Sequence, residues 1–447
     1  MIQAEREIQG RRAGGEAEVT GSSTPSQSRR FFRGLVTAWA LTLAVSCGGP
    51  EASGADARLA DAGGTVVVRP GIDVLLSDSL HLVRGRRVGL ITNHTGVDRD
   101  GRSSIDRLAE HPELDLVALY SPEHGIEGRA EAGESVTSRT DTRTGLPVHS
   151  LYGETRRPTT EMLEGIEVLL FDLQDIGARY YTYVYTMAYA MEEAGRHGIP
   201  FVVLDRPNPL GGATVQGNVL DPAFSTFVGL YPVPMRHGMT PAELARLYVG
   251  EFGIEVALHT VPVADLTRAM TFDVTGLPWI PPSPNIRTLE SALAYPGTCL
   301  FEATPLSVGR GTDRAFEWVG APWLDGALLA ERLNARGLES VRFEPATFTP
   351  RGAGDGKFDG VEVHGVRVVP GEASFDAPRV GVAMLIEARR MSGDRWTWNV
   401  AHMDRLAGTD ALRLGIEAGR SVEELTEAWD EQARAFTATR SAYLLYP

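Results

Sequence analysis

Four short apolar runs, each followed directly by polar residues, constrain the fold of this chain more than any other feature of its sequence. The runs are 88–91, 116–120, 168–171 and 201–204. A continuous apolar run of this length is typical of a strand that is buried on both faces of a parallel sheet. Ligands of open α/β sheets bind outside the carboxyl ends of the strands. The sequence therefore predicts an α/β fold with one polar site at the edge where these strands end.

Strand-like and helix-like segments alternate over residues 66–289. The strand-like segments are 87–91, 114–120, 166–171, 200–204 and 254–263, and the helix-like segments are 103–111, 183–197 and 240–252. This alternation is the pattern of βαβ units, and it predicts a Rossmann-like parallel-sheet domain. No Gly-x-Gly-x-x-Gly follows the first strand and the chain has no P-loop, so we expect no dinucleotide and no other cofactor.

The pattern changes after about residue 290. Helix-like segments at 324–337 and 421–436 flank three segments that we interpret as strands and a helix, at 342–350, 361–369 and 380–390. We expect a smaller α+β domain at residues 290–447, with a cleft between the two domains. Segment 131–146 lacks periodicity and is predicted to be a long loop over the site.

The first 65 residues are predicted to direct and tether the protein rather than to fold with it. Residues 1–47 contain a short apolar run, 34–46, that is too short to span a bilayer but typical of a signal sequence. Small residues lead into Cys47, which we interpret as a lipidation site, and a plain secretory signal is the alternative. Residues 48–65 are predicted to be a flexible tether. We therefore expect export to the cell envelope or periplasm, with a lipid anchor on Cys47 binding a membrane.

Charge and cysteine content exclude other classes of function. The net charge is −15, which argues against a nucleic acid as partner, since such proteins present a basic face. The two cysteines, Cys47 and Cys299, cannot form a disulfide framework. Cys299 lies in an apolar stretch and is predicted to be buried.

The candidate catalytic residues are carboxylates at strand ends. Glu123, next to His124, follows the second strand, and a carboxyl group in a partly dry cleft can act as a general acid. Asp172 and Asp175 follow the third strand and are candidates for the base or nucleophile. Two carboxylates from different strand ends would meet the basic requirement of glycoside hydrolysis. The alternative is that Glu123 binds turn amides and that the two aspartates form an ion-pair network with Arg179.

The candidate binding residues are polar or aromatic and surround these carboxylates. Arginine and amide side chains make bidentate hydrogen bonds that suit sugar hydroxyls, carboxylates or acetamido groups. A structural Asp–Arg bridge is the alternative for the turn at 205–209. The candidates are Asn93, His94, Gln174, Arg179, Tyr181, Asp205, Arg206, Asn208, His237, Asn285 and Arg310.

Two other chemistries remain open as weaker alternatives. His94, His124 and His237 could hold a metal with Glu123, but no His-Glu-x-x-His or Cys-x-x-Cys spacing occurs, so we predict no metal. A serine hydrolase would need Ser121 or Ser283 with a histidine, and no Gly-x-Ser-x-Gly elbow is present.

In these motifs the chain resembles the NamZ (YbbC-like) family of exo-β-N-acetylmuramidases. The resemblance covers about residues 70–447 and is carried by segments 92–96, 121–125, 171–179, 205–209, 282–285 and 309–312. It implies a Rossmann-like domain, a smaller C-terminal domain and an active site in the cleft between them. It also implies release of the non-reducing terminal β-1,4-linked N-acetylmuramic acid (MurNAc) from peptidoglycan fragments such as MurNAc-GlcNAc. A metal-dependent peptidoglycan amidase or deacetylase and a non-catalytic cell-wall-binding lipoprotein are the alternatives.

Overall fold

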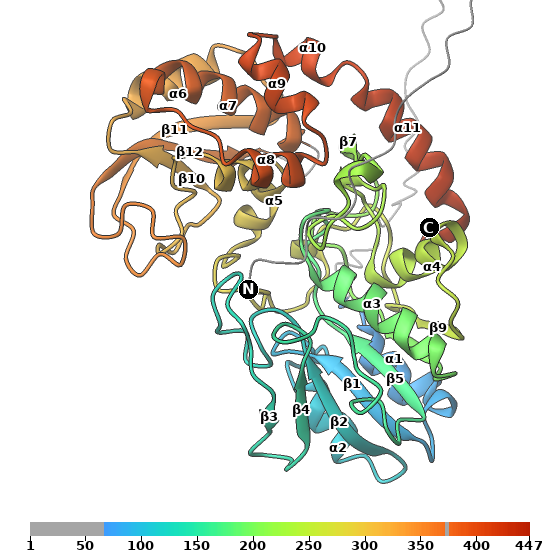
Figure 1. Cartoon of the computed structure of the whole chain (residues 1–447). Coiled ribbons are helices and arrows are strands. Elements are labelled where there is room, and N and C mark those ends of the chain that lie inside the picture. Colours follow the sequence, from blue (N-terminus) through green and yellow to red (C-terminus); the bar gives the residue numbers. More distant parts are fainter. Residues whose placement is uncertain (1–66, 372–374) are drawn as a thin grey trace, which may run out of the picture. The chain divides into compact units, whose positions relative to one another are not determined.

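A seven-stranded, mostly parallel sheet organises the N-terminal part of the chain (Figure 1). The computed structural model describes residues 67–371 and 375–447, so the predicted leader, Cys47 and the tether lie outside the described residues. The strand order is β3-β4-β2-β1-β5-β6-β9. The strands are β1 (Arg87–Thr92), β2 (Asp115–Ser121), β3 (Arg139–Thr140), β4 (Pro147–Ser150), β5 (Val168–Asp172), β6 (Phe201–Leu204) and β9 (Leu258–Val261).

The strand order reverses at β1, as in Rossmann folds. From β1 the sheet extends to β2 and β4 on one side, and the chain then returns to add β5, β6 and β9 on the other. All of these pairings are parallel, and only β3 runs antiparallel, against β4. This topology confirms the predicted α/β fold, and such folds bind ligands near the point of reversal.

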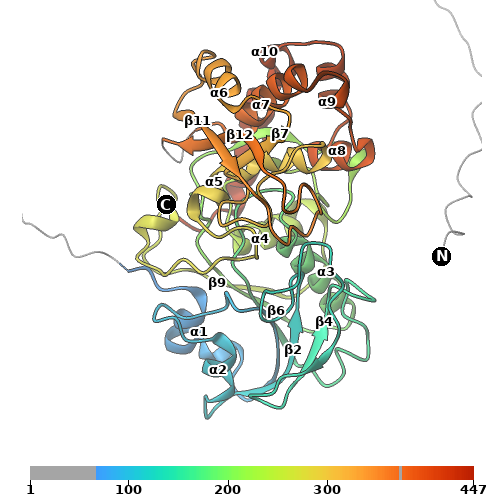
Figure 2. The ribbon, with the colours of Figure 1, turned by 90° about the vertical axis from the view of Figure 1, so that its left-hand side faces the viewer.

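The central strands β1, β2, β5 and β6 are mostly apolar because both faces of the sheet are covered. In β5, Val168 and Leu170 pack with α1 (Gly71–Asp78) and α2 (Ser104–Ala109). Leu169 and Phe171 face the other way, toward α3 (Tyr183–Arg196) and α4 (Pro241–Phe252). Figure 2 shows α1 and α2 on one side of the strands and α3 on the other. Each buried apolar side chain of this size contributes about 1.5–3 kcal/mol to the stability of the fold.

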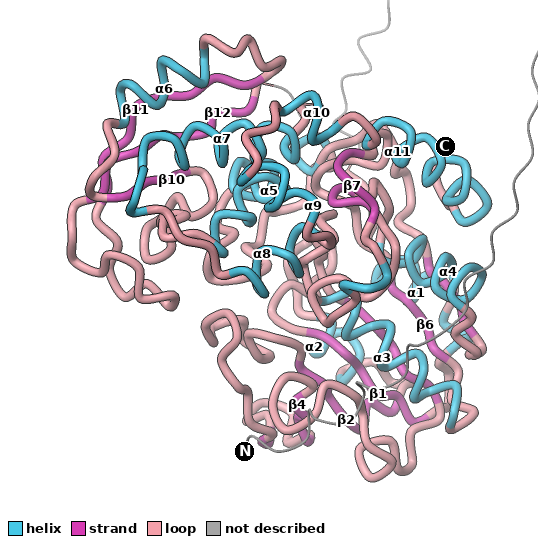
Figure 3. Tube along the Cα trace, turned by 45° about the horizontal axis from the view of Figure 1, so that its top comes forward, coloured by secondary structure: helices cyan, strands magenta, loops and turns pink. Residues whose placement is uncertain are grey.

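The C-terminal part contains a small antiparallel sheet with helices, which confirms the predicted α+β character (Figure 3). Its strand order is β10-β12-β11, and α6 packs against β11 and β12. The strands are β10 (Trp318–Ala321), β11 (Val341–Phe348) and β12 (Val363–Pro370). The helices are α5 (Leu289–Thr298), α6 (Gly326–Asn334), α7 (Ala377–Ser392), α8 (Val400–Ala407), α9 (Ala411–Glu417), α10 (Val422–Thr426) and α11 (Trp429–Arg440).

The prediction of one helix at 421–436 is wrong in one respect. Ser421 and Glu424 form a capping box at its start, but the chain leaves the helix after Thr426 and begins α11 at Trp429. The break lets α10 pack on α7, while α11 packs on a separate hairpin of β7 (Gln216–Val219) and β8 (Pro234–Arg236).

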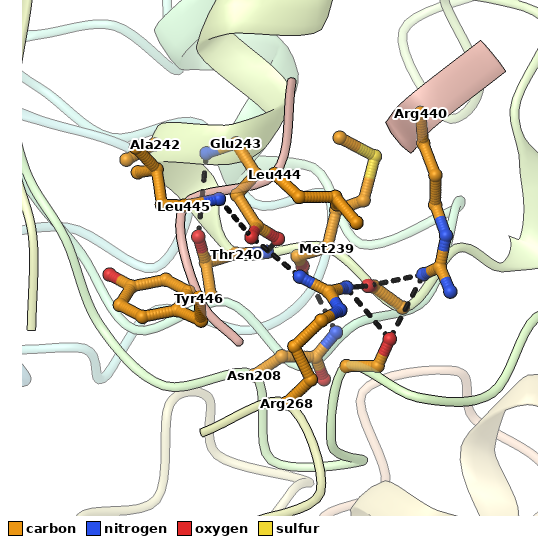
Figure 4. A network of polar contacts seen from close by, with 12 residues as sticks. Asn208, Met239, Thr240, Ala242, Glu243, Arg268, Arg440, Leu444, Leu445 and Tyr446 are labelled. Carbon is orange, nitrogen blue, oxygen red and sulfur yellow. Dashed lines mark hydrogen bonds and ion pairs between the residues drawn. The ribbon is translucent and has the colours of Figure 1, made fainter. Parts of the chain in front are cut away.

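The C-terminus returns along α11 to the start of α4. Thr240 and Glu243 form the predicted capping box, and Gly253 ends the helix in the left-handed conformation, with φ of 72°. The buried Glu243 carboxylate also accepts hydrogen bonds from Arg268 (2.6 Å) and the Leu445 amide (2.9 Å) (Figure 4). The last residues of the chain therefore brace the N-terminal sheet region.

Within residues 67–371 and 375–447, no helix is long and apolar enough to cross a bilayer.

Candidate functional site

A cavity of about 430 Å³ is lined by residues from both the N-terminal and the C-terminal parts of the chain. Five of the residues predicted from the sequence line it, and they come from segments far apart in the chain. They are Glu123, His124, Tyr181, Asn285 and Arg310. Thus the sheet edge predicted to carry the site does contribute to a cavity.

Glu123 is held in this cavity by neutral donors. The residue follows β2 in the chain and is 9% exposed. One carboxylate oxygen accepts a hydrogen bond from the Gly133 amide (2.8 Å) and the other from the Thr182 hydroxyl (2.7 Å). No described arginine or lysine forms an ion pair with it. Gly133 belongs to the segment that we predicted as a loop over the site.

His124 adopts a strained backbone conformation beside this carboxylate. Its φ is 70°, a value that non-glycine residues rarely adopt and that is often found at functional sites. Its Nδ1–H donates to the Ala130 carbonyl at 2.7 Å, and burial lowers the pKa of the imidazole. The ring is therefore neutral at pH 7, with Nε2 as an acceptor.

An aromatic wall covers one side of the cavity. The rings of Tyr181 and Tyr183 meet edge to face at 5.0 Å, and those of Tyr181 and Tyr295 at 6.0 Å. Tyr185, in contrast, points away into the core, where its hydroxyl donates to the Arg179 carbonyl at 2.6 Å. Aromatic faces of this kind suit the apolar faces of sugar rings.

The C-terminal side of the cavity contains a carboxylate paired with an arginine. The same Glu302 oxygen accepts from Nε (2.6 Å) and Nη2 (2.5 Å) of Arg310. Arg310 also lies over the Phe316 ring, 5.2 Å from its centre. Asn285, at the end of the N-terminal part, donates to the Glu131 carboxylate at 3.3 Å and so holds the predicted loop.

Asp172 does not line the cavity. Its carboxylate receives Nε (2.5 Å) and Nη2 (3.1 Å) of Arg206, and also the Ser104 hydroxyl. Arg206 additionally donates to the Val97 carbonyl at 2.7 Å. This Asp–Arg bridge joins the ends of β5 and β6. It is the structural bridge that we weighed for the turn at 205–209, but with Asp172 rather than Asp205 as the partner.

Asp175 and His237 are buried together, outside the cavity lining. His237 Nε2 lies 3.8 Å from an oxygen of Asp175, and that oxygen also accepts from the Gly177 amide at 2.7 Å. Burial raises the pKa of Asp175 to about 7. Burial, followed by the charges of Arg440 and Arg236, lowers the pKa of His237 to about 3.

The alternative, an ion-pair network of Arg179 with Asp172 and Asp175, does not form. Arg179 is fully buried and donates to four main-chain carbonyl oxygens instead. The acceptors, with their distances, are Asn218 (2.7 Å), Val233 (3.1 Å), Leu406 (3.1 Å) and Ala407 (2.8 Å). The side chain therefore joins the segment after β5 to the end of α8.

The remaining candidates do not line the cavity and hold buried loops instead. Asp205 accepts from the Thr240 hydroxyl (2.7 Å) and the Ala242 amide (2.9 Å), and Tyr446 also donates to it. The other four side chains each bind within the protein: Asn208 to the Met239 carbonyl, Gln174 to the Pro207 carbonyl, Asn93 to the Tyr183 hydroxyl and His94 to the Pro281 carbonyl.

Reasoning from the sequence did not identify several residues that line the cavity. Tyr152 and Arg156 follow β4, a strand that was not predicted. Recognising β4 beside β2 would have placed both at the same sheet edge as Glu123. Glu302, His402 and Arg405 also line the cavity, but they lie on helical segments of the C-terminal part, for which the sequence holds no strand-end signal.

The three histidines weighed as metal ligands do not converge. In residues 67–371 and 375–447, no group of three or more histidine, cysteine, aspartate or glutamate side chains is arranged to hold a metal ion. Ser283 lines the cavity, whereas Ser121 does not.

Comparisons with known proteins identify the family of this chain and agree with its fold. The N-terminal model of the exo-β-N-acetylmuramidase NamZ matches residues 88–290, and its C-terminal model matches residues 293–446. The peptidoglycan β-N-acetylmuramidase NamZ of Bacillus subtilis (strain 168) is 45% identical over 381 residues, which cover 85% of this chain and 91% of that protein.

Two crystal structures of DUF1343-family proteins from Bacteroides fragilis NCTC 9343 share the fold. One is 35% identical, with a TM-score of 0.79, and covers 86% of this chain and 100% of its own. The other is 30% identical, with a TM-score of 0.68, and covers 85% of this chain and 99% of its own. The chain therefore belongs to the NamZ family of exo-β-N-acetylmuramidases.

Proposed function

We propose that this protein is a glycoside hydrolase that releases the non-reducing terminal β-1,4-linked MurNAc from peptidoglycan fragments. The observation that carries the proposal is the buried Glu123 carboxyl group in a cavity walled by tyrosines. The relative that is 45% identical over most of the chain is a peptidoglycan β-N-acetylmuramidase.

Glu123 acts as the general acid. Its two oxygens are held by the Gly133 amide and the Thr182 hydroxyl, and no described arginine or lysine forms an ion pair with it. Protonation of the leaving oxygen by such a group contributes about 10²–10⁴ to the rate. His124, beside it, lines the cavity as a neutral ring whose Nε2 accepts a hydrogen bond from a substrate hydroxyl.

Arginines at the cavity select muramic acid over glucosamine, because only muramic acid has a lactyl carboxylate. Arg156 lies over the rings of Phe227 (4.5 Å) and Tyr152 (5.2 Å). Arg405 lies on α8, beside His402. Neither guanidinium is in an ion pair with a described carboxylate, so both are available to bind the lactyl group.

Export and anchoring complete the proposal. The apolar run before Cys47 supports a signal sequence, and a substrate in the cell wall lies outside the cytoplasm. A lipid on Cys47 would hold the enzyme at the envelope, with residues 48–65 as the tether. The separate N- and C-terminal family matches support a division into residues 66–289 and 290–447.

The test is incubation of the full chain, purified in detergent, with MurNAc-GlcNAc, with and without a chelator, followed by mass spectrometry. We expect free MurNAc in both samples. Activity that disappears only with chelator would instead support a metal-dependent amidase or deacetylase. Binding without turnover of this disaccharide or of longer glycans would support a cell-wall-binding lipoprotein.

A further inference from the structure

A second carboxylate is needed in the cavity, and the strand-end aspartates do not supply it. Asp172 is bound by Arg206 and Asp175 is buried beside His237, and neither lines the cavity. Four carboxylates do line it. Asp355 is exposed and Glu131 binds Asn285, whereas Glu123 is buried and the Glu302 side chain is 18% exposed.

Cationic groups surround Glu302. One of its oxygens receives both Nε and Nη2 of Arg310, whose side chain is 10% exposed. Lys357 lies close by and donates to the Glu302 main-chain carbonyl at 3.2 Å. Burial raises the pKa of Glu302, but the charge and hydrogen bonds of Arg310, with smaller effects from His402 and Lys357, outweigh it, and the net shift is downward.

The second oxygen of Glu302 is less engaged. Among the described residues, its hydrogen-bond donor is the Cys299 thiol at 3.6 Å, and a thiol is a weak donor. The hydrogen bonding of Glu302 differs from that of the buried Glu317, which does not line the cavity. Glu317 uses one oxygen for Arg314 (3.0 Å) and Arg367 (3.2 Å) and the other for the Thr288 hydroxyl (2.7 Å). A purely structural carboxylate in this part of the chain thus has both oxygens bound.

The two cavity carboxylates therefore have opposite surroundings. Neutral donors hold Glu123, whereas a buried arginine holds Glu302 as an anion. Paired carboxyl groups whose environments differ in this way take the acid and the anionic role in glycosidases. We propose that Glu302 is the second catalytic carboxylate, the anion that acts at the anomeric carbon while Glu123 protonates the leaving oxygen. This inference rests on the proposed glycosidase function.

The step balances without any additional reactant. Glu123 gives its proton to the glycosidic oxygen as the bond from that oxygen to C1 breaks. In one route Glu302 bonds to C1, and water then displaces it and returns a proton to Glu123. In the other route Glu302 takes a proton from the water that attacks C1, and exchange with solvent restores both groups. Both routes consume one water and yield free MurNAc and the shortened glycan.

Two substrates separate the two roles. 4-Nitrophenyl β-MurNAc has a leaving group that needs no proton, whereas MurNAc-GlcNAc needs one. We expect Glu123→Gln to lose at least about a hundredfold on the disaccharide and far less on the nitrophenyl glycoside. We expect Glu302→Gln to lose at least about a hundredfold on both. In Glu302→Ala, added azide should restore turnover and appear in the product as a glycosyl azide.

The controls separate chemistry from folding. Glu317→Gln breaks a comparable buried Glu–Arg pair and should keep wild-type kcat on both substrates. Circular dichroism and the binding of free MurNAc confirm that each variant is folded, and Glu302→Asp, which keeps the charge near Arg310, should also lose most of kcat. A folded Glu302→Gln that hydrolyses the nitrophenyl glycoside within tenfold of wild type would overturn the inference. If the wild-type protein cleaves neither substrate, the proposed function itself fails.

Discussion

Replacing Arg179 with methionine removes a buried guanidinium group that joins the segment after β5 to the end of α8. The group donates to four main-chain carbonyl oxygens, at Asn218, Val233, Leu406 and Ala407. Two of them keep another donor after the substitution, since Val233 also accepts from the Leu220 amide and Ala407 from the Asn218 side chain. The loss of folding free energy therefore comes mainly from the carbonyls of Asn218 and Leu406.

The expected loss follows from these two groups. A buried acceptor left without its donor costs about 1–3 kcal/mol, so the free energy of unfolding should fall by about 2–6 kcal/mol. Urea denaturation, monitored by tryptophan fluorescence, should show this change as a lower midpoint urea concentration. The matched control is Arg196→Met on α3. That side chain is 64% exposed and pairs with Glu193 at the surface, so the change should stay within about 1 kcal/mol.

Activity distinguishes this bracing role from the substrate-binding role that the sequence suggested. The end of α8 carries Arg405 and Leu406 into the cavity, so Arg179→Met should also lower kcat at a temperature where the variant is still folded. A variant with an unchanged urea midpoint and a raised KM alone would refute the bracing argument and restore Arg179 as a ligand of the substrate.

Three further outcomes follow from the site. Glu123→Gln should lower kcat on MurNAc-GlcNAc by about 10²–10⁴ with little change in KM, measured by release of MurNAc. Arg156→Met should raise KM for this substrate by about tenfold to a hundredfold, but leave KM unchanged for a substrate whose lactyl group is a methyl ester; equal effects on both would exclude carboxylate recognition. Burial raises the pKa of Asp175 to about 7 in the folded protein, so the folded state prefers the protonated carboxyl group. This preference stabilises the fold at acid pH, and the stabilisation is lost as pH rises from about 4 to 7. Asp175→Asn should therefore reduce the fall in melting temperature over that interval, and an unchanged pH profile would contradict this.

The sheet was predictable because its strands are buried on both faces. β1, β2, β5 and β6 each contain one of the predicted apolar runs. β4 was missed because Val148 is its one large apolar residue, and a strand beside the short edge strand β3 needs less apolar surface. α1 was missed because its N-cap residue is Pro70, which provides no side-chain capping hydrogen bond.

The cavity was only partly predictable because its two sides come from distant segments. Glu123 stands at a strand end, where sequence reasoning expects a functional carboxylate. Glu302 stands in a short helical turn, and only Arg310, eight residues later in the chain, and the approach of the N-terminal strand ends make it part of a site. Periodicity carries no information about that approach.

The excess of predicted binding residues has a physical cause in the loops that follow β5 and β6. These loops are buried, and a buried loop must satisfy its backbone amides and carbonyls with side chains when no strand or helix does so. Asp175 accepts from the Gly177 amide, Asn208 donates to the Met239 carbonyl, and Arg179 reaches carbonyls more than two hundred residues away at the end of α8. The support beneath a polar cavity thus requires the same residue types as the cavity itself. What separates the two sets is which side chains reach the cavity: Glu123 lines it, whereas Asp172 and Asp205 are bound by Arg206 and Thr240 outside its lining.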